Sequence, residues 1–293
     1  MVLDKEDVSL YYEVRGSGEA LILIHGVIVD AGLYENAAEL LAQHYRVITY
    51  DRRGISRSRL KDPAGISAPA GNDSGNSLQL SSGDDKDDAA VFMDRQIQDI
   101  LDLMDHLQVE DAFFAGASAG AVIGQYLLQK APDRVRHLIM YEPAMLGFMA
   151  EEADVAEWTR KMLDLIEKHK YNSAILAFAE NIASFDSRSP RKPVDVSFRE
   201  MHNHEYCLRT EFPALVRYRP DPDAMKRMAD RITLAAGEKS EGTFYYRSAL
   251  ALAECIGKKA VFFPGYHNLP FDLPQEFAIN VLGTLLLSQR APE

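Results

Sequence analysis

Residues 112–131 read AFFAGASAGAVIGQYLLQKA, with Ser118 at the centre of a Gly-x-Ser-x-Gly pattern. The residues before this pattern are apolar and predict a short buried strand, whereas residues 119–131 have helical spacing and end at Pro132. Small residues on both sides of Ser118 permit a sharp, strained turn between that strand and that helix. Such a turn would lift the Ser118 hydroxyl over the edge of a sheet, where a nucleophile is accessible. A structural serine in a tight turn is the alternative interpretation.

Short apolar runs alternate with longer amphipathic segments along most of the chain. Residues 8–14 predict an opening strand, and the apolar runs that predict buried strands are residues 20–24, 47–50, 112–115, 137–141, 232–236 and 260–263. The segments that predict helices are residues 31–44, 91–107, 119–131, 243–255 and 275–287. This alternation predicts an α/β fold with a mostly parallel central sheet flanked by helices.

Two segments depart from the alternation. Residues 61–88 are rich in Gly, Ser, Asp and Asn, and we expect a mobile loop there because so few large apolar side chains cannot offset the entropy of ordering. Between Pro143 and about residue 230 the periodic segments, 155–168 and 172–182, are helical. We therefore expect a core made of residues 1–143 and 231–293, with an inserted helical cap at residues 144–230.

Composition narrows the class of protein. The 293 residues are 47% hydrophobic, which suits one α/β domain with an insertion, and the formal net charge of −12 disfavours binding to nucleic-acid phosphates. No segment approaches the roughly 20 apolar residues that span a bilayer, and the N-terminus shows no signal peptide. The two cysteines, Cys207 and Cys255, do not form a disulfide or zinc pattern. We expect a cytoplasmic protein with no cofactor, no metal and no membrane association.

The motifs together resemble the α/β-hydrolase family over nearly the whole chain. They are His25-Gly26 after an early strand, Ser118 in its turn and His267 near the end. More narrowly, residues 50–58 (YDRRGISRS) and Glu142-Pro143 resemble a bacterial branch of that family. The resemblance implies an α/β-hydrolase fold and a serine-dependent hydrolase that uses no cofactor.

The base that the resemblance implies is His267. Of the eight histidines, only His267 lies in a short loop after a late strand, within the Pro264-Gly265-Tyr266-His267 stretch that matches the family's "PGxH" pattern. A base at that position can reach Ser118 across the carboxyl edge of the sheet. For His25 the family implies a role in shaping the oxyanion loop. His202 and His204 fall in the expected cap, where we expect a surface or pocket-lining role.

The acid of the triad departs from the family's usual pattern. Most members place an Asp after the seventh strand, where this chain has Ser240. Glu238 or Glu241 could serve from a shifted loop, the triad could be incomplete, or the acid could be Glu142. We favour Glu142, because it ends a buried strand that should neighbour the strand of Ser118. The fungal lactone hydrolases that open zearalenone are similar in placing a Glu after the sixth strand.

Acyl transfer also needs donors for the developing oxyanion. The residue after the nucleophile supplies one N–H, here Ala119, and the family implies a second from Val27, with Gly26 as a substitute. The expected reaction is cleavage of a carboxylic ester, lactone or thioester of a small apolar molecule. A ligand-binding protein with slow turnover and an acyltransferase are the alternatives. The oligomeric state is left open, with a homodimer among the possibilities.

Overall fold

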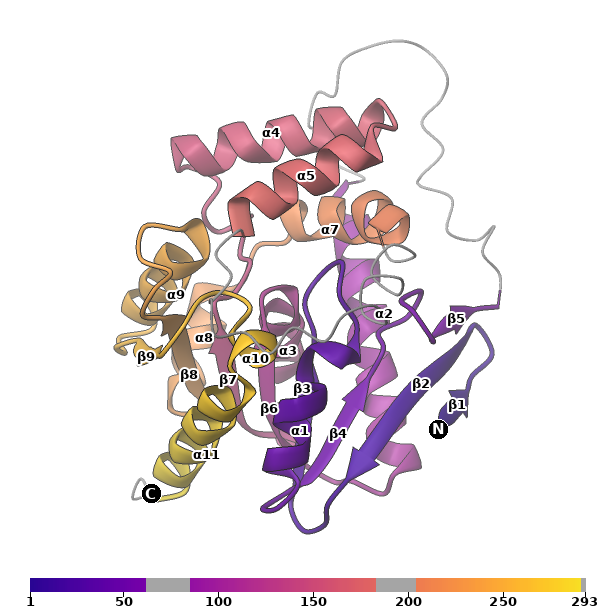
Figure 1. Ribbon diagram of the computed structural model, residues 1–293, viewed down its shortest axis with the longest axis vertical. Coiled ribbons are helices and arrows are strands. Elements are labelled where there is room, and N and C mark those ends of the chain that lie inside the picture. Colours follow the sequence, from indigo (N-terminus) through magenta and orange to yellow (C-terminus); the bar gives the residue numbers. More distant parts are fainter. Residues whose placement is uncertain (62–84, 183–203, 291–293) are drawn as a thin grey trace.

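The computed structural model describes residues 1–61, 85–182 and 204–290. An open sheet runs through the molecule, with helices on both of its faces and further helices over one end (Figure 1). The strands are β1 (Val2–Asp4), β2 (Val8–Arg15), β3 (Ala20–Ile24), β4 (Arg46–Tyr50), β5 (Arg59–Leu60), β6 (Ala112–Ala117), β7 (Val135–Tyr141), β8 (Ile232–Gly237) and β9 (Val261–Phe263). Their order is β1-β2-β4-β3-β6-β7-β8-β9, with β5 on β2.

The sheet is mostly parallel, as predicted. β2 pairs antiparallel with β1, β4 and β5, whereas each neighbouring pair from β4 through β3, β6, β7 and β8 to β9 is parallel. Parallel neighbours bring the carboxyl ends of β3, β4, β6, β7 and β8 to one edge. The loops that follow these strands therefore meet at that edge, which is where α/β folds place their ligands.

Helices connect and follow these strands, and most of them cover the two faces of the sheet. They are α1 (Glu35–Leu41), α2 (Asp85–His106), α3 (Ala119–Lys130), α4 (Ala153–Glu167), α5 (Tyr171–Ile182), α7 (Phe212–Arg217), α8 (Pro222–Arg227), α9 (Phe244–Cys255), α10 (Leu269–Asp272) and α11 (Pro274–Arg290). The predicted helix at 31–44 divides into a 3₁₀ turn, Ala31–Tyr34, and α1. Helix α2 begins at Asp85, so the loop predicted at 61–88 ends earlier than expected, and residues 62–84 of it lie outside the described residues.

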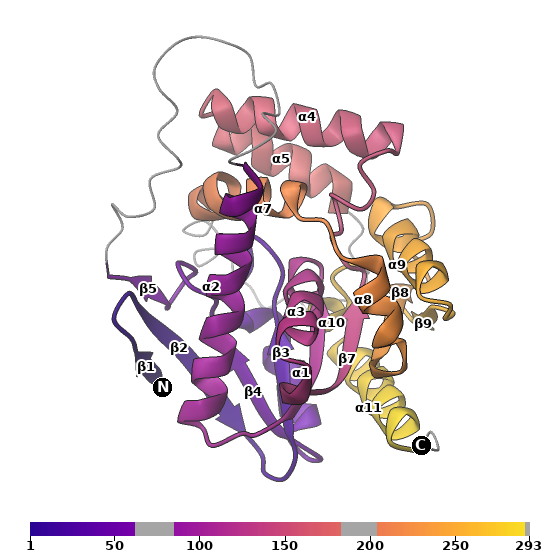
Figure 2. The same ribbon diagram turned by 180° about the vertical axis from the view of Figure 1, so that it is seen from behind.

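Strand β3 shows how the core is built. Ile22 and Ile24 pack in the cluster that includes side chains of α2, α3 and α9, while Leu21 and Leu23 face the cluster formed with α1 and α11. Figure 1 shows α1 and α11 on the near face, and Figure 2 shows α2 and α3 on the opposite one. The run of residues 20–24 is continuously apolar because this strand is buried on both faces.

A helical insertion separates β7 from β8. Within its described residues we find helices and no strand, and α4, α5 and α7 lie over the carboxyl edge of the sheet (Figures 1 and 2). A single π-helical turn, Cys207–Glu211, leads directly into α7. The expected limits of the cap, residues 144–230, stay a prediction. In the described part of the chain, no helix is long and apolar enough to cross a membrane.

The fit of α3 against β3 gives a stability prediction. A Cβ added to Gly120 would lie 2.0 Å from the Ile24 carbonyl oxygen, so Gly120→Ala must push α3 away from the sheet. We expect this change to lower the free energy of unfolding by about 1–3 kcal/mol, the usual cost of overpacking. Urea unfolding of the purified variant measures it.

Gly283→Ala is the matched control. A Cβ there meets nothing within 4 Å on an exposed part of α11. Replacing a mid-helix glycine by alanine should raise the free energy of unfolding by about 0.5–1 kcal/mol. A Gly120→Ala protein as stable as the Gly283→Ala protein would contradict this account of the packing.

Candidate active site

Ser118 lies at the turn between β6 and α3. Its backbone angles are φ 56° and ψ −122°, a conformation that a residue with a Cβ rarely adopts. The turn is held because the Ser118 N–H donates to the Tyr141 carbonyl at 3.0 Å and its own carbonyl accepts from the Ala121 and Ala144 amides. The predicted sharp turn is therefore present, and its strain is balanced by hydrogen bonds on both sides.

Small residues around Ser118 are required by close backbone approach. A Cβ on Gly116 would lie 2.5 Å from Gly120, and the Gly120 position is blocked by β3 as described above. A Cβ on Gly26 would come within 3.1 Å of the Ser118 Cβ, so the loop after β3 lies directly against Ser118. The pattern that identified Ser118 in the sequence is thus the one that lets three backbone segments converge on it.

Glu142 follows β7, the strand next to that of Ser118. The register pairs Ala117 with Tyr141, so Ser118 and Glu142 each come immediately after paired residues. The Glu142 Oε2 atom lies 2.7 Å from His267 Nδ1, and Oε1 accepts the Gly237 N–H at 2.8 Å. Both oxygens of this fully buried carboxyl group therefore have partners. Because a carboxylate oxygen accepts, Nδ1 carries the hydrogen and Nε2 is left as the basic nitrogen.

The other two candidate acids lie elsewhere. Glu238 and Glu241 are exposed, and neither forms a hydrogen bond or ion pair with His267 in the described part of the structure. Ser240, at the family's usual Asp position, is buried. Its Oγ is close enough to Gly237 that a Cβ there would lie 2.9 Å away. The structure brings together Glu142 and His267, and it does not bring Glu238 or Glu241 to this imidazole.

Two aromatic residues fix the position of His267. The ring of Tyr245, buried on α9, stacks on the imidazole with 3.9 Å between centroids. The Tyr141 hydroxyl donates to the Tyr266 carbonyl at 2.6 Å, which holds the loop one residue before His267. Sequence reasoning missed Tyr245, and no local signal could have found it, because its role depends on how α9 packs beside the loop.

Ser118 and His267 share no hydrogen bond among the described residues. Catalytic hydrogen bonds of this kind are often long in free enzymes and tighten when substrate binds. The site therefore contains a positioned imidazole and a strained serine at the same edge of the sheet.

The predicted oxyanion donors are the amides that follow Ser118 and Gly26 in the chain, and Gly26 lies directly against Ser118. The Ala119 N–H belongs to the first turn of α3, where amides have no intrahelical acceptor. Within the described residues, neither this amide nor that of Val27 donates a hydrogen bond. An N–H at the start of a helix that lacks an acceptor suits a developing negative charge.

His25 shapes the loop that carries Val27. Its Nε2 accepts the Arg52 N–H at 3.0 Å, so Nδ1 bears the hydrogen and donates to the Gly26 carbonyl at 2.8 Å. Burial and the nearby charge of Arg52 hold the pKa of His25 well below its usual value, so the ring is neutral. The structure thus places His25 against the loop after β3, and the oxyanion role that the resemblance implies for this loop stays a prediction.

The arginines of the YDRRGISRS stretch are paired with acids. Arg53 binds Asp99 with two hydrogen bonds of 2.7 Å, and Arg57 binds Asp51 at 2.6 Å. Arg52 is fully buried and pairs with Glu211 of the insertion at 2.5 Å. The stretch after β4 is thus held by ion pairs, one of which crosses to the insertion.

The remaining polar candidates do not form a metal site. No group of three or more His, Cys, Asp or Glu side chains suited to a metal occurs in the described ranges. His204 is half-buried at the start of the segment before the π-helix, and His202 lies outside the described residues. Cys207 and Cys255 are both free thiols.

Comparison with known proteins decides the family. A family model described as the alpha/beta hydrolase fold matches residues 19–173, more than half of the chain. The chain belongs to the α/β-hydrolase family. Uncharacterized hydrolase YraK of Bacillus subtilis (strain 168) is 32% identical to it over 265 residues, covering 89% of this chain and 86% of that protein.

Solved structures share the fold of this α/β-hydrolase. An esterase from Thermogutta terrifontis has a TM-score of 0.68 at 17% identity and covers 96% of this chain and 94% of its own. Est816, whose title describes an enzyme that degrades N-acyl homoserine lactones, has a TM-score of 0.65 at 20% identity and covers 97% and 99%. These structural likenesses show the fold, while the family model and the 32% identical relative give the family and the class of enzyme, a hydrolase.

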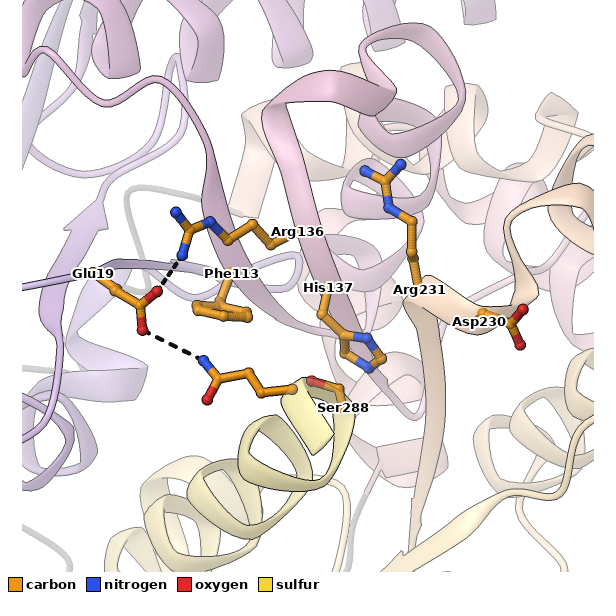
Figure 3. A pocket seen from close by; sticks show the side chains of 8 residues that line it. Glu19, Phe113, Arg136, His137, Asp230, Arg231 and Ser288 are labelled. Carbon is orange, nitrogen blue, oxygen red and sulfur yellow. Dashed lines mark hydrogen bonds and ion pairs between the residues drawn. The ribbon is translucent and has the colours of Figure 1, made fainter. Parts of the chain in front are cut away.

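A pocket lies far from the candidate site, near the amino ends of β7 and β8 (Figure 3). Its two arginines already have partners: Arg136 binds Glu19 and Asp111, and Arg231 donates to two backbone carbonyls. His137 borders this pocket, is buried, and lies 2.8 Å from the Thr233 hydroxyl. Burial, with the charges of Arg231 and Lys258, lowers the pKa of His137 to about 4.

His137 gives the α/β-hydrolase a predictable pH dependence of stability. Between pH 6.5 and about 4 the unfolded chain binds a proton at this residue that the folded chain does not. Stability is therefore lost as pH falls through this window. The side chain of His137→Gln can still bond to Thr233. As pH falls, we expect the free energy of unfolding of this variant to decrease less steeply than that of the wild type, with a difference in slope of about 1 kcal/mol per pH unit.

Urea unfolding at pH 6.5, 5.5 and 4.5 measures this slope for both proteins. His44→Gln is the control, because that imidazole is exposed to water in the folded chain. Parallel curves for wild type and His137→Gln would contradict the assignment, whereas the His44→Gln curve should follow that of the wild type.

Proposed function

We propose that this α/β-hydrolase cleaves ester-like bonds through an acyl-enzyme, with Ser118 as nucleophile, His267 as base and Glu142 as the acid that orients it. The observation that carries the proposal is the 2.7 Å hydrogen bond that His267 Nδ1 donates to the buried Glu142 carboxylate, at the sheet edge that also holds the strained Ser118 turn. A neutral imidazole with Nδ1 bound to a carboxylate is the form of histidine that accepts a serine proton.

The reaction has two steps. The Ser118 Oγ attacks the carbonyl carbon while His267 Nε2 takes the hydroxyl proton, and the Val27 and Ala119 amides stabilise the negative oxygen. The tetrahedral intermediate then breaks its bond to the leaving oxygen or sulfur, which receives the proton from His267. Water, activated by the same imidazole, attacks the acyl-enzyme, and the acid product leaves as Ser118 regains its proton.

The expected substrate is a small apolar carboxylic ester, lactone or thioester. Apolar character is supported by the aromatic side chains of the insertion and α9, which contact one another in a cluster: Trp158, Phe178, Phe212 and Phe244. The structural neighbours that share the fold include an esterase and a lactone-degrading enzyme, which makes esters and lactones the first compounds to test.

The proposal also covers the partners, the location and the oligomeric state of the protein. We propose a small-molecule substrate with no nucleic-acid partner, in keeping with the net charge of −12. A cytoplasmic location fits two cysteines that are unpaired in the described residues. A homodimer is kept as the oligomeric state to test.

A fluorophosphonate probe tests the proposal directly, because it reacts with an activated serine. We expect the wild type to gain one adduct by intact mass and the Ser118→Ala variant to gain none. We also expect Ser118→Ala to lower kcat for a short p-nitrophenyl ester by at least about 10³-fold, as loss of a triad member does.

Surface serines provide the control. Ser9→Ala removes a half-buried hydroxyl whose partner among the described residues is Asp4, and this variant should label and turn over like the wild type. Failure of the folded wild type to form an adduct, or labelling that persists in Ser118→Ala, would overturn the proposal.

A further inference from the structure

The peptide units on both sides of Val27 are held in place. The first unit joins the Gly26 carbonyl to the Val27 N–H, and the second joins the Val27 carbonyl to the Ile28 N–H. A planar trans peptide points its C=O and N–H in opposite directions, so an anchor on either group fixes the other. Restraints on Gly26 and Ile28 therefore decide where the Val27 N–H points.

The Gly26 carbonyl is anchored by Arg52. The Arg52 Nη2 donates to this oxygen at 2.8 Å, beside the bond from His25. Glu211 holds the guanidinium through two hydrogen bonds, 2.5 Å from Nη1 and 3.0 Å from Nη2. Burial alone would lower the pKa of Arg52, but the Glu211 carboxylate more than offsets it, so this fully buried group stays charged.

The Ile28 N–H is anchored by Cys207. It donates to the Cys207 Sγ at 3.2 Å, and burial together with the charge of Glu211 raises the pKa of that thiol, so sulfur remains neutral. Ile28 has φ 56°, which is strained for a β-branched residue and persists only when surrounding contacts impose it. The bond to Cys207 is a contact that can impose it.

Both anchors come from the same turn of the insertion. Cys207 and Glu211 are the first and last residues of the π-helix, and both are buried. The Tyr206 ring, one residue earlier, covers Gly54, where an added Cβ would lie 2.6 Å from it. Single π turns are rare and occur frequently at functional sites, and this one points two anchoring groups at the loop after β3.

We infer that the π-helical turn positions the oxyanion donor Val27, with Cys207 and Glu211 as the positioning residues. The chemistry of the hydrolase then depends on how the helical insertion packs against the loop after β3. This inference rests on the proposed function, because it assigns Val27 N–H to the oxyanion. Neither side chain touches the reacting atoms. Cys207 acts through Ile28, and Glu211 acts through Arg52 and Gly26.

The test compares the rate at which a fluorophosphonate labels Ser118 in three cysteine variants. Cys207→Val removes the sulfur acceptor while keeping an apolar side chain of similar size, and Cys207→Ser keeps an acceptor. Cys255→Val is the matched control, since Cys255 is the other free thiol and lies half-buried at the end of α9. Hydrogen exchange of the 25–30 backbone reports the loop itself, independently of catalysis.

We expect Cys207→Val to label roughly tenfold to a hundredfold more slowly, a loss smaller than that from removing a donor outright. Its kcat for a p-nitrophenyl ester should fall by a similar factor, while KM stays unchanged. Hydrogen exchange at residues 25–30 should be faster than in the wild type. Cys207→Ser should recover most of the rate, and Cys255→Val should match the wild type. A merely structural role would reduce the fraction of molecules that react, without slowing those that do.

A double variant tests the second anchor. Arg52→Met with Glu211→Met removes both members of the ion pair, because removing one leaves a buried charge unpaired and endangers folding. We expect a folded protein, by thermal melting, that labels at least tenfold more slowly and exchanges faster at residues 25–30.

The outcomes separate the two claims. A labelled wild type whose Cys207→Val and double variants react at the wild-type rate would overturn the inference alone. Faster loop exchange with unchanged labelling would also overturn it, since the anchors would then not position the donor. A wild type that never labels would overturn the proposed function, and with it this inference.

Discussion

The hydrogen bond between Glu142 and His267 is the interaction on which the candidate site depends. It joins a carboxylate that follows β7 to an imidazole that follows β9, across the intervening strand β8. The Glu142 backbone N–H donates to Ala235 of β8, and its second carboxyl oxygen accepts from Gly237 at the end of that strand. The carboxylate is thus tied to β8 by main-chain groups, although the residue itself belongs to β7.

This placement explains why the usual acid position can hold a serine. A carboxylate after β8 would compete with Glu142 for the same imidazole nitrogen, and two like charges in a buried site are unfavourable. The small side chain of Ser240 fits beside Gly237, and the Gly237 N–H donates to Glu142. Glu142 follows a strand that is one position farther from β9 than the usual acid's strand is. The longer side chain of a Glu therefore suits this place better than that of an Asp.

The insertion contacts the site at two places. Its π-helical turn reaches the loop after β3 directly through Cys207, and through Arg52, which Glu211 holds and which donates to Gly26. On the other side, Trp158 packs on Phe244, whose ring lies 3.8 Å from that of Tyr245, which in turn stacks on His267. The packing of the insertion is therefore linked both to the loop after β3 and to His267.

Much of this arrangement could be predicted from the sequence, because burial on both faces leaves a clear pattern. Strand β3 was predicted with its observed limits, and the adjacency of β6 and β7 made Glu142 the favoured acid. The polar composition of residues 85–88 predicts a loop, but they begin α2, because acidic residues suit the first turn of a helix. Tyr245 and Cys207 gave no local signal, since each acts through a partner far away in the chain: Tyr245 is 22 residues from His267 and Cys207 is 179 from Ile28.

The most direct test of the central claim is the esterase activity of Glu142→Gln beside that of Glu238→Gln. Glutamine keeps the size of the side chain but can present its amide to His267, which favours the wrong tautomer and removes the charge that stabilises the imidazolium. The account predicts that kcat falls by about 10³-fold or more in Glu142→Gln at wild-type stability, while Glu238→Gln stays at the wild-type rate. Equal activity of Glu142→Gln and wild type, or a comparable loss in Glu238→Gln, would contradict it.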